Sequence, residues 1–122
     1  MSCRDFENLP RFDQQEALER CMDSLDFLQE LADVFVSESL PMYLPRIQEG
    51  VDNRDFDKVA GNAHGLKGGC SSIGLTRLRE MSYCLEKAGK DKDLQTMERV
   101  VAELTQEAQK VEQLITSREL WR

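Results

Sequence analysis

Apolar residues recur at steps of three and four along most of the chain, the spacing that places them on one face of an α-helix. The clearest run lies near the C-terminus and consists of Leu94, Met97, Val101, Leu104, Ala108, Val111 and Ile115. A seam of this kind is typical of a helix in a bundle or coiled coil. No stretch alternates apolar and polar residues with a period of two, so the pattern predicts an all-α chain.

Capping residues and prolines divide this pattern into separate helices. Asp13 and Ser24 are suitable N-caps, and Glu16 completes a capping box with Asp13. Pro41 and Pro45 interrupt the second apolar run, and an interior proline kinks a helix. We therefore predict a short helix over 13–21, one long bent helix or two stacked helices over 24–50, and helices over 55–72, 75–88 and 94–115.

The connections between these helices are short. Gly74 interrupts the helical pattern after the helix over 55–72, and Gly89 is the expected stop of the following helix. Residues 90–93 form a polar link to the last helix. Amphipathic helices with short connections favour an antiparallel four-helix bundle, here with an additional short N-terminal helix. We predict that residues 1–12 are an extended lead-in and that residues 13–118 form the bundle.

Composition and charge narrow the functional classes. The chain has 122 residues, enough for one domain, with 23 acidic against 16 basic residues and a formal charge of -7. This balance argues against nucleic acid and against an anionic membrane surface as partners. No apolar run approaches the roughly 20 residues needed to span a bilayer, and residues 1–5 lack the features of a signal peptide. We expect a cytoplasmic protein.

Four cysteines are present, at positions 3, 21, 70 and 84, and none forms a C-x-x-C pair. With a single histidine in the chain, the usual Cys/His zinc signatures are absent. We expect four reduced cysteines, the central ones buried as small apolar residues, in preference to a disulfide or a metal site.

The residues that could take part in a chemical reaction lie in the segment 63–74, which contains the only histidine, His64. On a helix with 3.6 residues per turn, the apolar residues of this region cluster on the side opposite His64: Val59, Leu66, Cys70 and Ile73. The imidazole should therefore face water. Lys67 and Gly68 lie one turn further along on the same face. No carboxylate partner for the ring is evident, and Asp57, two turns back, is assigned no role.

Three glycines, Gly65, Gly68 and Gly69, follow the histidine. Interior helix glycines cost about 0.8–1.0 kcal/mol each relative to alanine, so their presence needs a reason. One explanation is that the helix ends here, and another is that a partner protein comes close to the backbone beside His64. The apolar stripe continues through the glycines, which favours the second explanation.

An exposed imidazole next to a fixed positive charge is suited to covalent phosphoryl transfer. Histidine is an established nucleophile in covalent catalysis. The ammonium of Lys67 could offset the charge of a phosphoryl group on the ring and help to orient it.

The stretch 63–74 resembles the phosphorylation motif of the histidine phosphotransfer (HPt) family, A-H-x-L-K-G followed by I-G. Here the motif is Ala63-His64-Gly65-Leu66-Lys67-Gly68 and then Ile73-Gly74. The resemblance extends over about residues 12–116, with two departures. Lys90 stands where the family often has arginine, and residues 69–72 read G-C-S-S where S-A-A-N or a similar tail is common.

This resemblance implies a four-helix bundle that relays a phosphoryl group between His64 and receiver-domain aspartates in a multistep two-component system. It implies His64 as phosphoacceptor, Lys67 as a source of charge and orientation, and Gly68 as the point of receiver access. The expected partners are response-regulator receiver domains, with a hybrid sensor kinase as a further candidate. We expect no cofactor of its own, because the receiver supplies Mg²⁺, and a monomeric protein.

Two other functions fit the sequence less well. A nucleotide-binding kinase is disfavoured because residues 65–71 do not follow the G-x-x-x-x-G-K-[ST] order and no strand precedes them. We therefore expect a phosphoryl carrier without ATP binding or autokinase activity, and not an enzyme. A catalytically inactive helical bundle acting as a protein–protein adaptor is the remaining alternative, but an adaptor has no need for an unobstructed histidine.

Overall fold

The computed structural model describes residues 3–121, and within this range it contains helices and no strand, as predicted. The elements are η1 (Phe6–Asn8), α1 (Gln14–Arg20), α2 (Leu25–Val34), η2 (Phe35–Ser39), α3 (Leu40–Asp52), α4 (Phe56–Ser72), α5 (Thr76–Lys90) and α6 (Leu94–Thr116). Here η1 is a 3-10 turn and η2 is a π-helical segment. Among the described residues, no helix is long and apolar enough to cross a bilayer.

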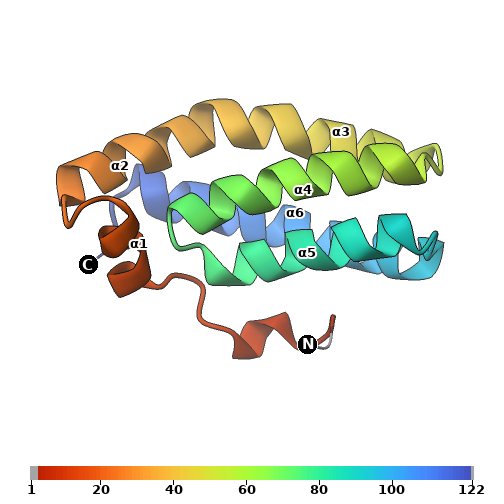
Figure 1. Cartoon of the computed structure of the whole chain (residues 1–122), viewed down its shortest axis with the longest axis horizontal. Helices are drawn as coiled ribbons and strands as arrows, with labels where there is room; N and C mark the ends of the chain where they lie inside the picture. Colours follow the sequence, from red (N-terminus) through yellow and green to blue (C-terminus); the bar gives the residue numbers. More distant parts are fainter. Residues whose placement is uncertain (1–2, 122) are drawn as a thin grey trace.

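The four long helices form an antiparallel bundle, which confirms the predicted fold class. Figure 1 shows α2, η2 and α3 running on as one helix, with α4 and α5 beside it and α6 behind. Helix α4 packs between α3 and α5, while α6 packs against α5, α3 and α2. The short helix α1 lies across one end, and the chain before it returns along α5 (Figure 1).

The second helix is one continuous helix through both prolines, which decides between the two predicted arrangements. Pro41 has no N–H, and its ring would collide with the carbonyl of Ser37 in a regular α-helix. The chain widens into the π turn of η2 immediately before Pro41. A wider turn removes this collision without breaking the helix, and such turns are usually single insertions of this kind.

Both predicted N-caps are present. Asp13 accepts a hydrogen bond from the Glu16 amide at 3.0 Å, and Ser24 accepts one from the Phe27 amide at 3.2 Å. The capping box is not closed, however, because the Glu16 carboxylate pairs with Arg79 of α5 at 3.1 Å. The side chain expected to support its own helix instead ties α1 to the bundle.

The predicted end of the fourth helix, residue 88, is two residues too early, and the role predicted for Gly89 as a helix stop is wrong. Gly89 lies inside α5, which ends at Lys90. A Cβ atom at Gly89 would lie 2.8 Å from the Phe56 carbonyl oxygen and 3.0 Å from the Ala60 amide. The glycine therefore permits a close crossing of α5 over α4, and this crossing fixes how the two helices align.

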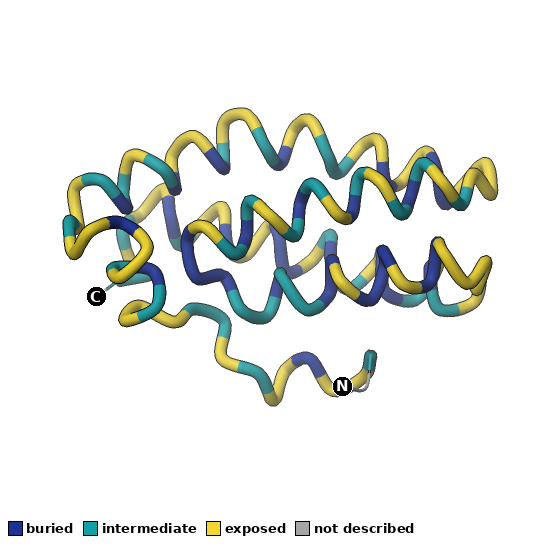
Figure 2. Tube along the Cα trace, viewed as in Figure 1, coloured by how far each residue is buried: buried dark blue, intermediate teal, exposed yellow. Residues whose placement is uncertain are grey.

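The buried residues line the inner faces of the four long helices, as the burial colours along the trace show (Figure 2). The four residues predicted as the core stripe of the third helix region, Val59, Leu66, Cys70 and Ile73, are all buried. Because this stripe faces inward, the opposite side of α4 faces solvent.

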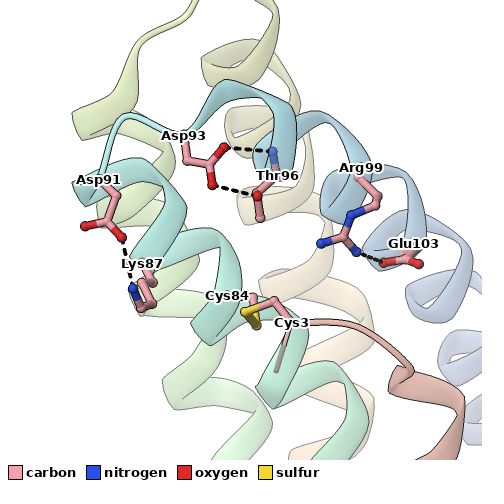
Figure 3. The surroundings of a disulfide bond; sticks show 8 residues. All are labelled: Cys3, Cys84, Lys87, Asp91, Asp93, Thr96, Arg99 and Glu103. Atoms are coloured by element: carbon pink, nitrogen blue, oxygen red, sulfur yellow. Dashed lines mark hydrogen bonds and ion pairs between the residues drawn. A yellow bond between two sulfur atoms is a disulfide. The ribbon is translucent and has the colours of Figure 1, made fainter. Parts of the chain in front are cut away.

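The expectation of four reduced cysteines is wrong for two of them. Cys3 and Cys84 form a disulfide, with their Cα atoms 5.7 Å apart (Figure 3). Cys3 reaches α5 because the lead-in folds back along that helix. Phe6 is buried in the core, and Arg77 donates hydrogen bonds to the carbonyls of Glu7 and Leu9.

The two central cysteines behave as predicted. Cys21 and Cys70 are free and buried. Burial raises the pKa of both thiols, most strongly for Cys70. Neither thiol is therefore suited to act as a thiolate nucleophile.

Removing the disulfide should weaken the fold. Cys3→Ser in the oxidised protein is expected to lower the free energy of unfolding by about 2 kcal/mol, because the bond closes a loop between residues 81 positions apart. This is the low end of the usual range, since the freed end of the lead-in regains entropy in the native state. Chemical denaturation of both proteins, with and without a dithiol reductant, measures the effect. Equal stabilities under oxidising conditions would show that the bond contributes nothing.

Candidate functional site

Helix α4 displays His64 near its middle. Asp55 caps the helix by accepting a hydrogen bond from the Lys58 amide at 3.1 Å. Two turns later the imidazole of His64 projects from the face opposite the core stripe, and its side chain is 67% exposed. The exposed position that the apolar spacing predicts for this ring is therefore confirmed.

The imidazole is held from one side by a carboxylate of the neighbouring helix. His64 Nδ1 lies 2.9 Å from Oε2 of Glu86 in α5. The same carboxylate accepts hydrogen bonds from Lys67 Nζ at 2.6 Å and from Lys90 Nζ at 3.2 Å. One buried acid thus joins the histidine to two lysines, and we call these four residues the Glu86 cluster.

Glu86 is ionised in this cluster although its side chain is only 8% exposed. Burial alone would raise the pKa of this carboxyl, but hydrogen bonds from the two lysines and the imidazole outweigh burial and lower the pKa from 4.5 to about 2. A buried charge is tolerated in proteins when it is paired and hydrogen-bonded in this way. The cluster therefore places a permanent negative charge behind the imidazole.

The ionised carboxylate fixes the tautomer of the ring. A carboxylate can only accept hydrogen bonds, so Nδ1 of His64 carries the proton and donates a hydrogen bond to Glu86. The second nitrogen, Nε2, then holds the free lone pair, and no residue in the range 3–121 hydrogen-bonds to it. The arrangement presents one nucleophilic nitrogen to solvent in a fixed orientation.

The three glycines after His64 have different roles, which corrects the favoured of the two explanations from the sequence, that a partner protein approaches the backbone at all of them. A Cβ atom at Gly65 would lie 2.6 Å from ring atoms of Tyr43, and one at Gly69 would lie 3.3 Å from the ring of Phe35. These two glycines accept aromatic rings of the same chain. Gly68 alone of the three has no described atom within 4 Å of such a Cβ, so only its surface is open to a partner. The helix does not end at the glycines, because α4 continues to Ser72.

The surface differs on the two sides of the histidine. Towards α2 and η2, an apolar groove of about 150 Å³ is lined mainly by Leu31, Val34, Phe35 and Ile73. Towards α5, a larger hollow of about 370 Å³ is lined mostly by charged side chains. The exposed face of α4 with Gly68 runs between them.

Sequence reasoning placed three of the residues in this region correctly in space and missed two. His64, Lys67 and Gly68 lie together on one face, as predicted, although their roles stay predictions. Glu86 was missed, and Lys90 was given no role. The one available signal was the i, i+4 spacing of Glu86 and Lys90, which pairs them on a helix but does not direct them towards His64.

Comparison with known proteins identifies the family of this chain. A family model described as the Hpt domain matches residues 26–114, which covers α2 through most of α6. The phosphorelay intermediate protein rdeA of Dictyostelium discoideum is 26% identical over 106 residues. That match covers 87% of this chain and 41% of the relative, so the chain spans about two fifths of the relative's length.

A solved structure shares the fold. The crystal structure of histidine-containing phosphotransfer protein B from Pseudomonas aeruginosa PAO1 superposes with a TM-score of 0.79 at 23% sequence identity. The superposition covers 94% of this chain and all of that one. It supports the helical bundle, including the arrangement of the helices that carry the Glu86 cluster.

Proposed function

Because this chain belongs to the Hpt domain family of histidine phosphotransfer proteins, we propose that His64 is its phosphoacceptor. In this proposal His64 relays a phosphoryl group to and from receiver-domain aspartates of a multistep two-component system. The observation that carries the proposal is the hydrogen bond from Nδ1 to Glu86, which leaves Nε2 unprotonated and exposed.

The chemistry is an in-line displacement at phosphorus. The lone pair on Nε2 forms a P–N bond while the P–O bond to the receiver's aspartyl group breaks, and the aspartate leaves as a carboxylate. The ring gains positive charge as the P–N bond forms. The carboxylate of Glu86, 2.9 Å from Nδ1, stabilises that charge and holds the Nδ1 proton during transfer in either direction.

Lys67 supplies positive charge to the same face. Its ammonium is hydrogen-bonded to Glu86 at 2.6 Å, and its side chain remains 27% exposed. It lies one turn from His64, within reach of a phosphoryl group on that ring. It neutralises part of the phosphoryl charge, while Gly68 lets the receiver approach the helix.

In the proposed relay this chain acts as a phosphoryl carrier without ATP binding or autokinase activity, and the receiver partner supplies the Mg²⁺. It works as a cytoplasmic monomer with receiver domains, and a hybrid sensor kinase, as its partners. A bundle with no phosphotransfer, serving only as an adaptor, is the alternative, but it gives no reason for the Glu86 cluster.

A transfer assay tests the proposed function. The protein is mixed with a panel of receiver domains carrying labelled phosphoryl groups and Mg²⁺. We expect an acid-labile, base-stable label on this chain from at least one receiver. A folded protein that acquires no label from any receiver, and that binds receivers without transfer, would support the adaptor function instead.

Glu86 should act as a positioning residue. Glu86→Ala removes the acceptor of the Nδ1 proton, and the ring is then free to rotate and to change tautomer. We expect transfer to slow about tenfold or more, whereas Glu86→Gln should slow it less, because its amide oxygen still accepts the hydrogen bond from Nδ1 although it no longer offsets the positive charge of the ring. Single-turnover transfer rates of both variants measure this. Equal rates for the alanine and glutamine variants would contradict a positioning role.

The pKa of Glu86 also predicts a pH dependence of stability. Its pKa in the folded chain, about 2, lies below the ordinary value of 4.5. The ionised group therefore contributes stability that is fully present above about pH 4.5 and is lost as the pH falls through about 2. The difference in unfolding free energy between the wild type and Glu86→Gln should shrink over this interval. A difference that stays constant between pH 2 and 6 would contradict the assigned ionisation.

A further inference from the structure

Positive charge is concentrated in the hairpin that carries the proposed phosphoacceptor. Residues 58–90, covering most of α4 and all of α5, contain six Lys/Arg and two Asp/Glu. The rest of the chain contains ten Lys/Arg and twenty-one Asp/Glu. The hairpin is therefore at +4 while the remainder is at -11, an uneven distribution for a protein of net charge -7.

Three of these six basic side chains hold the fold together. Lys58 pairs with Glu49 of α3 at 3.2 Å. Arg79 pairs with Glu16 of α1, and Arg77 binds backbone carbonyls of the lead-in. These three side chains bind other parts of the fold and do not line the hollow beside the histidine, so they do not account for the positive face there.

The other three are lysines, and all of them line the larger hollow beside His64. This hollow, which we call the basic hollow, has a volume of about 370 Å³ and is lined by Lys67, Tyr83, Glu86, Lys87, Lys90 and Asp91. The carboxylate of Glu86 is buried, whereas the ammonium-bearing side chains of Lys87 and Lys90 are 59% and 67% exposed. Asp91 is the one exposed carboxylate in the lining, at 57%, and it is paired with Lys87. Three lysines against one exposed carboxylate leave an excess of positive charge at this surface.

An exposed aromatic ring lies in the same hollow. Tyr83 is 41% exposed, and the ammonium of Lys67 lies 5.6 Å from the centre of its ring. An exposed tyrosine beside a cation combines apolar contact area with hydrogen-bonding capacity, which is typical of residues at the centre of protein interfaces. The basic hollow thus has the composition of a docking surface for an acidic protein.

We propose that the basic hollow receives carboxylate side chains from the rim of the receiver domain that docks over His64. This inference rests on the proposed function, because it names a contact of the partner that donates or accepts the phosphoryl group. An aspartate site that binds Mg²⁺ is rich in carboxylates. The net charge of this chain would repel such a partner, while the local positive charge attracts it to the correct face and orients the encounter.

Lys87 is the residue for the test because it lines the hollow but makes no hydrogen bond to the Glu86 cluster. Its own partner is Asp91, at 3.0 Å, on the exposed rim (Figure 3). Lys87→Glu reverses the charge, Lys87→Arg retains it, and Lys110→Glu makes the same change of net charge on the exposed side of α6. Circular dichroism establishes that each variant is folded.

The measurements use a receiver domain that exchanges phosphoryl groups with the wild type. At low ionic strength, about 20 mM, we expect Lys87→Glu to slow the second-order transfer rate about fivefold or more. The difference should fall below about twofold at 0.5 M salt, where the Debye length is only a few ångströms. Lys87→Arg and Lys110→Glu should stay within about twofold of the wild type at both salt concentrations.

Three results would overturn the proposal. The first is a transfer rate for Lys87→Glu equal to that of the wild type at low ionic strength. The second is an equal slowing by Lys110→Glu, which would show that net charge, and not the hollow, determines the rate. Competition by inorganic phosphate at constant ionic strength would assign the hollow to small anions instead. Titration with unphosphorylated receivers separates this proposal from the proposed function. If a receiver binds the wild type without any transfer, and Lys87→Glu weakens that binding, the docking surface is supported and the relay is rejected. If receivers neither bind nor transfer, both proposals are rejected.

Discussion

His64→Gln should abolish phosphoryl acceptance without unfolding the protein. The substitution removes the nucleophilic Nε2, and the sequence contains no other histidine to replace it. The side chain is 67% exposed, and its one hydrogen bond to the described part of the chain is to Glu86, which a glutamine amide can also make. We expect a loss of label of at least about a thousandfold, with the unfolding free energy within about 0.5 kcal/mol of the wild type.

Transfer from a phosphorylated receiver, followed over time with wild type and variant side by side, measures this effect. Far-ultraviolet circular dichroism and chemical denaturation of the variant provide the control for folding. A labelled His64→Gln protein would place the phosphoacceptor elsewhere. A variant that loses its helical signal would contradict the exposed position of the ring.

The two glycines on either side of Leu66 and Lys67 should respond in opposite directions to the same substitution. Gly68→Ala is expected to stabilise the protein by about 0.5–1 kcal/mol, because alanine is the better helix former and no described atom lies within 4 Å of its Cβ. Gly65→Ala should destabilise by about 1–2 kcal/mol, because its Cβ would lie 2.6 Å from the ring of Tyr43, which must move.

The rate of phosphotransfer, unlike stability, should be sensitive to substitution at Gly68 and insensitive to substitution at Gly65. Gly68→Gln places a long side chain on the open surface beside His64 and should slow transfer about a hundredfold by blocking the receiver. Gly65→Ala, whose extra methyl points into the molecule, should transfer at a rate close to that of the wild type. Thermal or chemical unfolding gives the stabilities, and single-turnover transfer gives the rates. A normal rate for Gly68→Gln would show that the open glycine does not serve access.

The helices and the exposed face of α4 could be predicted because both depend on local spacing. The steps of three and four between apolar residues determine which side of a helix is buried, and Val59, Leu66 and Cys70 define that side without reference to any other helix. Once the core side is known, His64 is placed on the opposite side. The caps at Asp13 and Ser24 are equally local, since each acts within one turn.

The Glu86 cluster could not be predicted because it depends on how two helices align. Glu86 lies 22 positions from His64, and the close crossing at Gly89 decides which residues of α5 meet those of α4. From the sequence, this glycine is equally consistent with a helix stop. The pairing of Cys3 with Cys84 was missed for a similar reason, because the path of the lead-in depends on the burial of Phe6.

The uses of Gly65 and Gly69 were also beyond the sequence. An interior helix glycine indicates a close approach but does not identify what approaches. The structure assigns the rings of Tyr43 and Phe35 to these positions, both from the continuous helix that the π turn before Pro41 keeps intact. The aromatic rings that use the glycines therefore come from a helix whose course depends on tertiary packing.

The phosphorylated nitrogen of His64 tests the central claim most directly. The protein, uniformly labelled with ¹⁵N, is phosphorylated by a receiver and studied by ¹⁵N and ³¹P nuclear magnetic resonance. The hydrogen bond from Nδ1 to Glu86 predicts that phosphorus is bonded to Nε2, and that Nδ1 stays protonated. Phosphorus on Nδ1, or on any residue other than His64, would contradict the account.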